Sequence, residues 1–384
     1  MHIGVVTTSW PHDRDPIAGS FVRALTEALC ARGHRCTALF AAMPAPARPL
    51  AAHRCALVPV RYSPDDRSLF YQGGAPHRAR RQPVTSALLA SSFTAALARA
   101  ARRALASCDA IVSHFAVPSS LVVALGARRR PHHAILHGTD ALLLRRLPPV
   151  IHRAIARGCS SVQFAHPGLR EGLDEALAAH RSAIDLPMAA RIPSRSALDA
   201  RDHTRASLGI SQDQLMVLSV ARLAEEKALA ALALTAHEFK SDAPVRFVLA
   251  GDGPDRQALE RLARGRVTFT GAVDEATRDR LLAAADVFAL PSKRDGAPTA
   301  IVEALSFGLP VVATRVGGIP WLAGDAALYV EPERPAELAH TIKSLAESQT
   351  LRDTLSARAR ERHRALPTWD SLADHILRSV GATQ

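Results

Sequence analysis

Two carboxylates eight residues apart stand out in the C-terminal half of the chain. Asp295 and Glu303 lie in the segment DVFALPSKRDGAPTAIVEALSFGLPVVATRVGG, residues 286–318, and the stretch GAPT between them opens a predicted helix that continues to Phe307. Free N–H groups at the start of a helix attract a phosphate, and carboxylates accept hydrogen bonds from hydroxyl groups. Because a sugar nucleotide carries both kinds of group, the segment predicts a site for one.

Other motifs for nucleotide, metal or acyl chemistry are missing from the sequence. No GxGxxG opens a helix after the first predicted strand, and neither GxxxxGK[ST], HExxH nor GxSxG occurs. This disfavours a dinucleotide dehydrogenase, a P-loop phosphotransferase, a zinc protease and a serine hydrolase. In AGDGPD, residues 250–255, the two glycines Gly251 and Gly253 predict a tight turn between a strand and a helix.

Predicted strands and helices alternate along the chain. Apolar, β-branched runs predict strands, and stretches of helical period predict helices between them. Strands are expected at residues 3–9, 36–41, 110–115, 132–138, 215–223, 245–253, 267–273, 286–292, 310–318 and 327–332; helices at 20–33, 119–127, 229–240, 255–264, 276–285 and 300–308. This order predicts an α/β fold of two doubly wound parallel sheets, whose ligands bind at the carboxyl ends of the strands.

A linker near residues 185–200 divides the chain into two predicted domains. Residues 1–186 form the N-terminal domain and residues 187–366 the C-terminal domain, and the cleft between them is the expected ligand site. Residues 44–83 break the alternation with many Pro, Arg and Tyr residues. They are predicted to be an insertion or a long loop beside the first sheet.

Segment 286–318 resembles the E-x7-E signature of retaining glycosyltransferases of the GT-B fold, in particular glycosyltransferase family 4. SVARLAEEKALAALA looks like the family's strand, Arg, loop and Lys element, and LAGDGPDRQALERL, VTFTGAV and GLPVVATRVGGIP follow in the family's order. HGTD at 137–140 and AGSFVRALTEALCARGH at 18–34 resemble its N-terminal motifs. The resemblance covers most of the chain. It implies two Rossmann-like domains facing across a cleft, with a final helix at about 367–384 that crosses back to the N-terminal domain.

The resemblance also implies roles for individual residues. Arg222 and Lys227 would bind the donor diphosphate, Glu303 the ribose, and His137 would lie beside the transferred sugar. Asp295, which stands where the family usually has Glu, would hold the sugar ring and the β-phosphate together with the backbone around it. The implied catalytic set is His137, Arg222, Lys227 and Asp295, and the implied donor site adds Gly19, Ser20, Gly271, Gly296, Ala297, Pro298, Thr299 and Glu303.

Two further residues are candidates for contact with an acceptor, namely His114, which follows an apolar strand, and Asp140 of HGTD. The resemblance implies transfer without a metal or another cofactor, with Arg222 and Lys227 in place of a divalent ion. The expected activity is that of a retaining hexosyltransferase with a UDP-linked donor and a hydroxyl acceptor in lipopolysaccharide, exopolysaccharide or lipid-linked glycan assembly. Three alternatives stay open: a tailoring enzyme for a secondary metabolite such as an aminocyclitol, a UDP-sugar 2-epimerase, and a non-catalytic nucleotide-binding partner.

Charge is distributed unevenly between the two halves. The net charge is +12; residues 1–186 hold 23 Arg, no Lys and 11 acidic residues, whereas residues 187–384 hold 25 basic and 25 acidic residues. This predicts a basic face on the N-terminal domain for an anionic membrane surface or a charged acceptor, with two candidate clusters, Arg78, Arg80, Arg81 and Arg128, Arg129, Arg130. Aromatic residues, at 4%, are too few to favour nucleic acid.

The expected location is the cytoplasm, peripheral on the inner face of the plasma membrane. MHIGVVTTSW lacks a basic flank and predicts a first strand rather than a signal peptide, and no uninterrupted apolar run of about 18 residues predicts a spanning helix. Five widely spaced cysteines without a CxxC pair predict reduced, mostly buried thiols.

Overall fold

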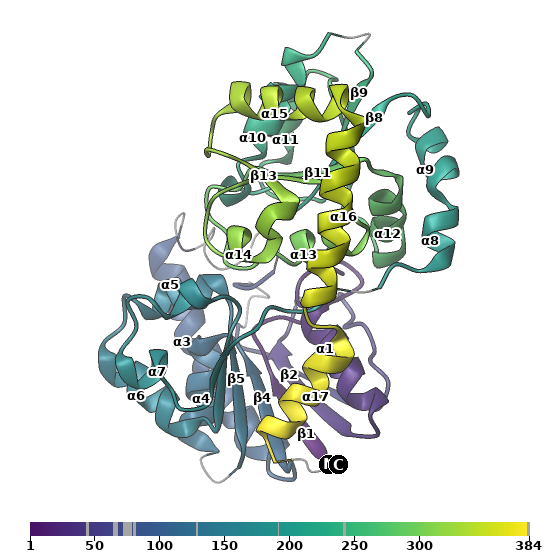
Figure 1. Cartoon of the computed structure of the whole chain (residues 1–384). Helices are drawn as coiled ribbons and strands as arrows, with labels where there is room; N and C mark the ends of the chain where they lie inside the picture. Colours follow the sequence, from purple (N-terminus) through teal and green to yellow (C-terminus); the bar gives the residue numbers. More distant parts are fainter. Residues whose placement is uncertain are drawn as a thin grey trace. The chain divides into compact units, whose positions relative to one another are not determined.

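The computed structural model describes residues 1–381 except 44–45, 64–67, 72–78, 80–81, 128–129, 191 and 241–242. The chain forms two compact units, each built around a parallel sheet (Figure 1). Unit 1 comprises Met1–Met188 and Pro367–Gln384, and unit 2 comprises Ala189–Leu366. The predicted fold class, two doubly wound α/β domains, is confirmed.

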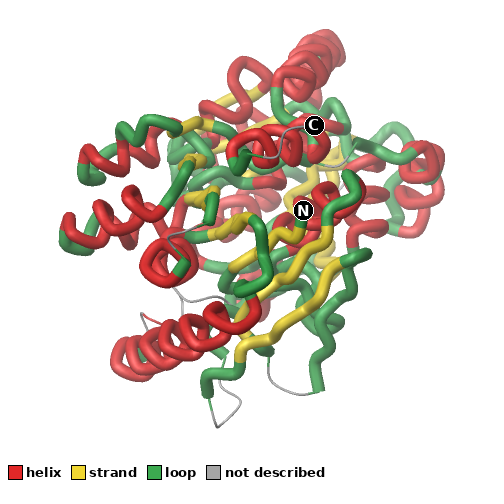
Figure 2. The backbone as a smooth tube through the Cα atoms, turned by 90° about the horizontal axis from the view of Figure 1, so that it is seen from below, coloured by secondary structure: helices red, strands yellow, loops and turns green. Residues whose placement is uncertain are grey.

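The sheet of unit 1 has seven parallel strands in the described part of the chain, in the order β3-β2-β1-β4-β5-β6-β7. Figure 2 shows strands lying side by side with helices around them. The central strands are apolar on both faces because helices cover both, which explains why β4 is buried at every position. The strands are β1 His2–Val6, β2 Arg35–Ala41, β3 Cys55–Val60, β4 Ala110–His114, β5 His132–Leu136, β6 Ser161–Phe164 and β7 Ala183–Asp185.

The helices of unit 1 include the last one of the chain. Leu25 and Leu29 of α1 share a core cluster with Leu372 and Ile376 of α17, and Arg32 forms an ion pair of 2.8 Å with Asp370. Figure 1 shows α17 beside α1. The helices are α1 Ser20–Ala31, α3 Pro83–Ala104, α4 Leu121–Gly126, α5 Gly138–Leu144, α6 Pro149–Gly158, α7 Glu175–Ala178 and α17 Trp369–Ser379, with short helical turns at Ala116–Ser120 and Pro167–Arg170.

Unit 2 has six parallel strands among its described residues, in the order β10-β9-β8-β11-β12-β13. Alternate residues of β8 face the two sides, Met216 and Leu218 in one core cluster and Val217 in the other. The strands are β8 Leu215–Val220, β9 Val245–Ala250, β10 Val267–Gly271, β11 Val287–Leu290, β12 Val311–Thr314 and β13 Ala327–Val330.

Helices cover both faces of this second sheet as well. They are α8 Arg195–Asp199, α9 Arg201–Ser207, α10 Leu229–Thr235, α11 Arg256–Ala263, α12 Glu275–Ala284, α13 Thr299–Ser306, α14 Ile319–Ala323, α15 Pro335–Glu347 and α16 Gln349–Ala365, with short helical turns at Glu225–Lys227, Ala236–Glu238 and Gly324–Ala326.

Each sheet reverses its strand order at its centre, between β1 and β4 in unit 1 and between β8 and β11 in unit 2. Loops that follow two such strands diverge to opposite sides, which leaves an open place at the carboxyl edge where ligands of these sheets bind. The candidate residues follow these strands: Ser20 after β1, His114 at the end of β4, Arg222 after β8 and Asp295 after β11.

The prediction of a loop over residues 44–83 is wrong for Cys55–Val60. These residues form β3, which pairs with β2 from Cys36↔Cys55 to Ala41↔Val60. β3 is an edge strand and is partly exposed, so its sequence lacks the unbroken apolar run of a central strand. Because Val60 accepts from Ala42 of the neighbouring chain segment, Pro59 faces away from β2 and its missing N–H costs no ladder hydrogen bond.

One helix bears on the expectation that no segment of the chain spans a membrane. Among the described residues, one helix, α3, is long and apolar enough by length and composition to cross a membrane, with a mean hydropathy of 1.3 over 18 residues. The expectation was based on an unbroken apolar run. Serine and threonine interrupt such a run in α3 but lower its mean hydropathy only slightly. In the structure Phe93 and Leu97 of α3 are buried in a core cluster with Leu39 and Ile111, so this helix covers the sheet.

Candidate functional site

Lys227 and Asp295 lie together at the centre of the unit 2 sheet. Lys227 ends the short turn that follows β8, and Asp295 lies in the loop after β11. The Lys227 Nζ atom is 2.5 Å from Asp295 Oδ2, and the Ser292 hydroxyl donates to the same oxygen at 3.2 Å. With 18% and 11% of their side chains exposed, both charges are largely shielded yet accessible to a ligand.

Arg222 forms an ion pair with Glu226, a residue that sequence reasoning missed. Burial by itself would raise the pKa of Glu226, but the charge of Arg222, a backbone hydrogen bond and the charge of Lys227 lower it overall. The backbone carbonyl of Glu226 also accepts from the N–H of Lys293 at 2.9 Å. Glu226 therefore joins the loop that carries both cations to the loop that carries Asp295. Its place directly before Lys227 was the available sequence signal.

Glu303 lies in α13 and pairs with a cation from a neighbouring helix. Arg278 of α12 places an Nη atom 3.2 Å from Glu303 Oε1, and their side chains are 12% and 17% exposed. Sequence reasoning missed Arg278, because no motif marks a single arginine within this helix. The pair fixes the Glu303 carboxylate one helical turn after Thr299, at which α13 begins.

Glycines make the close packing of these loops possible. A Cβ at Gly251 would lie 1.9 Å from the Ala221 carbonyl oxygen, so the loop after β9 packs against the loop that carries Arg222. Gly317, at φ +53°, allows the same close packing against Asp295, because a Cβ added to Gly317 would lie 1.7 Å from the Asp295 carbonyl oxygen. Of the two glycines predicted to form a tight turn, Gly253 does so, since its carbonyl accepts the Arg256 N–H at 3.2 Å, whereas Gly251 donates its N–H to the Gly271 carbonyl at 2.8 Å.

The arrangement in unit 2 combines groups that bind anions with groups that bind hydroxyls. Arg222, Lys227 and the first turn of α13, preceded by Gly296, Ala297 and Pro298, offer positive charge and N–H groups. Asp295 and Glu303 offer acceptors for hydroxyl hydrogens. The structure brings Lys227 and Asp295 into contact and pairs Arg222 and Glu303 with other residues.

The N-terminus of α1 supplies the predicted glycine loop in unit 1. Gly19, at φ +77°, precedes Ser20, and a Cβ added there would lie 2.5 Å from the Ser9 carbonyl oxygen. The loop after β1 and the start of α1 are therefore packed backbone against backbone, which only glycine permits. The next residue, Phe21, places its ring 5.0 Å from that of His137. Phe21 thus links the start of α1 to His137.

His114, His137 and Asp140 form one group at the ends of β4 and β5. The rings of His114 and His137 are nearly parallel, with centroids 5.4 Å apart, and His114 Nδ1 lies 3.2 Å from His137 Nε2. Asp140 Oδ2 accepts the Ala116 N–H at 2.8 Å. His114 is 0% exposed. Its side chain is therefore not accessible for the direct contact with an acceptor that the sequence led us to expect.

Burial controls the protonation of this group. It lowers the pKa of His137 to about 3 and that of His114 well below its usual value, where the neighbouring His137 adds to the effect. Burial likewise raises the pKa of Asp140 to about 7, although backbone N–H groups that bond its carboxylate oppose the shift. Both imidazoles are therefore neutral near pH 7, and they act through hydrogen bonds rather than charge.

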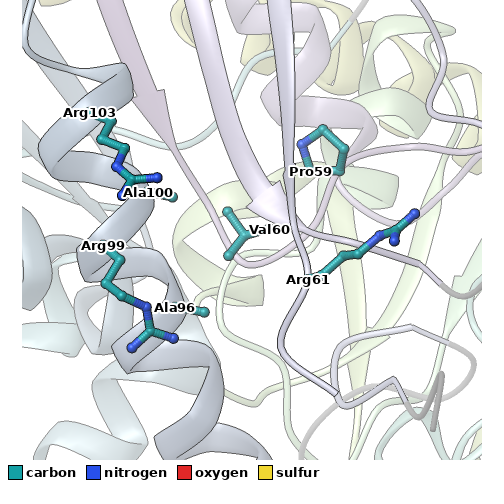
Figure 3. A pocket seen from close by; sticks show the side chains of 7 residues that line it. All are labelled: Pro59, Val60, Arg61, Ala96, Arg99, Ala100 and Arg103. Carbon is teal, nitrogen blue, oxygen red and sulfur yellow. The ribbon is translucent and has the colours of Figure 1, made fainter. Parts of the chain in front are cut away.

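A groove of 420 Å³ lies elsewhere on unit 1, between β3 and α3 (Figure 3). Arg99 and Arg103 project from α3 beside Val60, and Arg61 follows the end of β3. None of the residues predicted for the donor or the acceptor lines it. It is a basic surface distinct from the site residues above.

The C-terminal part of the chain matches a known family. Residues 200–362 match the model described as "Glycosyl transferases group 1". The chain is 31% identical over 240 residues to a Bacillus subtilis glycosyltransferase assigned to teichuronic acid biosynthesis, TuaC; the match covers 61% of this chain and 60% of TuaC. The chain thus spans less than two thirds of that relative's length.

Solved structures resemble the whole chain. Sucrose-phosphate synthase from Thermosynechococcus elongatus matches with a TM-score of 0.75 at 19% identity, covering 98% of each chain. Anabaena Alr3699/HepE, solved in complex with UDP-glucose, matches with a TM-score of 0.71 at 19% identity over 99% of this chain and 100% of that one. The fold is that of the GT-B glycosyltransferases.

Proposed function

We propose that this chain is a retaining hexosyltransferase that moves a sugar from a UDP-linked donor to a hydroxyl acceptor without a metal ion. The observation that carries the proposal is the set of cations and carboxylates at the switch point of unit 2, Arg222, Lys227 and Asp295 with Glu303 on the adjoining helix. These residues lie within the segment that matches the glycosyl transferase family model. Cations suit a diphosphate, and carboxylates suit the hydroxyl groups of a ribose and a hexose.

The donor would be held by charged side chains that are already ion-paired in the structure. Arg222 and Lys227 take the diphosphate, Glu303 accepts from the ribose hydroxyls, and Asp295 accepts from the hexose. Glu226 and Asp295 give up part of their contact with the two cations as the phosphates arrive. Since the leaving diphosphate gains negative charge in the transition state, the two cations stabilise that state more than the bound substrate.

The transfer itself would proceed on one face of the sugar. The anomeric carbon–oxygen bond to the diphosphate breaks through an oxocarbenium-like state, and the acceptor oxygen forms the new bond on the same face. The acceptor proton passes to the departing phosphate oxygen, so no protein nucleophile is needed. His137 of unit 1 would hydrogen-bond a hydroxyl of the transferred sugar.

We favour an acceptor from lipopolysaccharide, exopolysaccharide or lipid-linked glycan assembly, at an anionic membrane surface. TuaC, by its name, is a putative glycosyltransferase of teichuronic acid biosynthesis. Most arginines of the two predicted clusters, Arg78, Arg80, Arg81, Arg128 and Arg129, lie outside the described residues, and the Arg130 guanidinium donates to the Ala106 carbonyl. The described basic surface is on α3 instead.

Four exposed residues of α3 define what we call the α3 surface: Val84, Leu88, Arg99 and Arg103. Val84 and Leu88 are 72% and 67% exposed, and they lie one helical turn apart, as do the two arginines. α3 contains no acidic residue. Apolar side chains that enter the interface and arginines that meet anionic headgroups, each contributing about 1 kcal/mol, are the two attractions that hold a peripheral protein at a bilayer.

The function is tested by measuring donor and product directly. Sugar nucleotides with different bases are screened for thermal stabilisation of the full chain, and the best donor is then offered with a panel of acceptors that includes lipid-linked glycans and aminocyclitols. We expect stabilisation by UDP-sugars, transfer in the presence of EDTA, and an α-linked product from an α-linked donor, by NMR. A β-linked product excludes the retaining mechanism.

The alternatives give different outcomes in the same experiment. A donor that turns into its 2-epimer without any acceptor identifies an epimerase. Binding of UDP-sugars without release of UDP, whatever the acceptor, identifies a non-catalytic partner. Either result would replace the proposal.

A further inference from the structure

His114 and His137 share one hydrogen bond whose direction has a chemical consequence. Their rings are parallel to within 7°, and 3.2 Å separates His114 Nδ1 from His137 Nε2. Since a hydrogen bond requires one donor and one acceptor, a single proton lies between these nitrogens. Either His114 donates through Nδ1–H, or His137 donates through Nε2–H.

Both rings are neutral, so each carries one N–H. Burial lowers the pKa of both imidazoles, that of His137 to about 3. The direction of the shared hydrogen bond therefore determines whether the other nitrogen of each ring is protonated. If His114 donates, His137 carries its proton on Nδ1; if His137 donates, its Nδ1 has a free lone pair that could accept a proton.

The other nitrogen of His114 distinguishes the two arrangements. His114 is 0% exposed, and its Nε2 has no hydrogen-bond partner among the residues that the structure describes. If His137 were the donor, the proton of His114 would sit on Nε2 as a buried N–H without an acceptor. Orphaned buried N–H groups are rarer in folded proteins than under-satisfied acceptors, because an unpaired buried donor loses its hydrogen bond to water without replacement.

We propose that His114 is a positioning residue that donates to His137 and holds it in the Nδ1–H tautomer, so that His137 presents a hydrogen-bond donor and not a base. Both nitrogens of His137 are then accounted for, Nε2 as acceptor from His114 and Nδ1–H for a ligand.

The ring of His137 is also fixed in place by its neighbours. Phe21 and Phe115 place their rings 5.0 Å and 4.8 Å from it. Phe115 adopts φ +70°, a strained conformation for a non-glycine residue that persists only where the surrounding structure holds it. Asp140, the titratable side chain on the adjoining α5, bonds the Ala116 N–H through Oδ2. A 180° flip of the ring, which would put the carbon Cε1 where Nε2 now meets His114, would have to displace this packing.

The consequence for catalysis rests on the proposed function. His137 in the Nδ1–H tautomer cannot take the proton of the acceptor hydroxyl, because its one lone pair is engaged by His114. That proton then goes to the phosphate oxygen that leaves the anomeric carbon, while His137 donates to an oxygen of the sugar. The tautomer itself exists with or without that reaction.

The tautomer is measured by long-range ¹H–¹⁵N correlation NMR on the full chain labelled with ¹⁵N-histidine. The resonances of His137 are those lost in His137→Gln. We expect a protonated Nδ1 and an unprotonated Nε2. A protonated Nε2 on His137 would overturn the proposal, and no ligand or activity is needed for this result.

Two variants of matched size test the role of His114. Asn places an N–H near the position of Nδ1, whereas Leu has a similar shape without a donor. In His114→Asn we expect the His137 tautomer to stay and turnover to remain within about threefold of wild type; in His114→Leu we expect a mixture of tautomers and a loss of roughly tenfold, which corresponds to one hydrogen bond. Equal turnover of the two variants would contradict the positioning role.

The outcomes separate this proposal from the proposed function. If the wild-type chain transfers no sugar, the proposed function fails, while the His137 tautomer still decides the assignment of His114. If His114→Leu does not fold, as judged by its melting transition, the wild-type spectrum alone decides.

Discussion

The Lys227 ammonium lies 2.5 Å from a carboxylate oxygen of Asp295, 68 residues further along the chain. Lys227 follows β8 and Asp295 follows β11, and these strands are neighbours in the sheet although two other strands separate them in sequence. The pair therefore lies at the switch point of unit 2. An anion that binds Lys227 must compete with Asp295, so under the proposed function the affinities for the diphosphate and for the hexose would be linked.

Replacing either cation should slow transfer strongly. For Arg222→Ala and Lys227→Ala we expect kcat/KM to fall by about 2–4 kcal/mol of transition-state stabilisation, because each cation compensates charge on the leaving diphosphate. The melting temperature should change little by comparison. Lys240→Ala removes an exposed lysine of the same unit and serves as the control. Wild-type kcat/KM in either variant with a competent donor and acceptor would show that the diphosphate is bound elsewhere.

Calorimetry should show different ligand-binding roles for the carboxylates of Asp295 and Glu303. Asp295→Asn releases Lys227 from its ion pair, so free UDP should bind as well as to wild type or better, while the UDP-sugar loses the hydrogen bond to its hexose. Glu303→Gln should weaken both ligands, because both carry the ribose. Equal losses of UDP affinity in the two variants would contradict the assignment of Asp295 to the hexose.

Arg278 should affect recognition of the ribose through Glu303. In Arg278→Met we expect UDP to bind roughly tenfold more weakly and the preference for UDP over 2′-deoxy-UDP to shrink, because the carboxylate is no longer held by a charged hydrogen bond worth about 1.5–3 kcal/mol. Arg280→Met on the same helix, where the guanidinium bonds Thr277, is the matched control. An unchanged ratio of UDP to 2′-deoxy-UDP affinity in Arg278→Met would exclude this role.

Asp140 should make stability depend on pH. Burial raises its pKa in the folded chain to about 7 from an ordinary value near 3.8, so the folded state binds the proton more tightly than the unfolded state. Stability from this group is therefore present at low pH and is lost as the pH rises from about 4 to about 7. The melting temperature of Asp140→Asn relative to wild type should rise across that range. A difference that is constant with pH would contradict the shift.

The α3 surface should bind anionic bilayers. The full chain should sediment with liposomes that contain phosphatidylglycerol but not with pure phosphatidylcholine, and binding should be lost between about 0.1 M and 0.5 M salt, where screening shortens the Debye length. Arg99→Gln with Arg103→Gln should weaken binding, whereas Arg261→Gln with Arg264→Gln, which removes the same charge from an exposed part of unit 2, should not. Equal effects of the two double variants would contradict membrane binding by the α3 surface and would favour a soluble, charged acceptor as the partner of the basic residues 1–186.

The sequence by itself was sufficient for the fold class and for most elements of unit 2. Its strands there are short apolar runs, of which the central ones are buried on both faces, and several of its helices show helical periodicity, so local patterns carry the information. The same local information located the segment from Asp295 to Glu303, because an anion-binding helix start and its flanking carboxylates are adjacent in the chain.

Tertiary structure decided which of these groups act on one another. Nothing near Lys227 in the sequence indicates Asp295, nothing near Glu303 indicates Arg278, and nothing near His137 indicates His114, because each pair is made by the order of strands and helices around a sheet. β3 escaped prediction for a related reason. An edge strand is exposed and accepts a proline, so only its pairing with β2 distinguishes it from a loop.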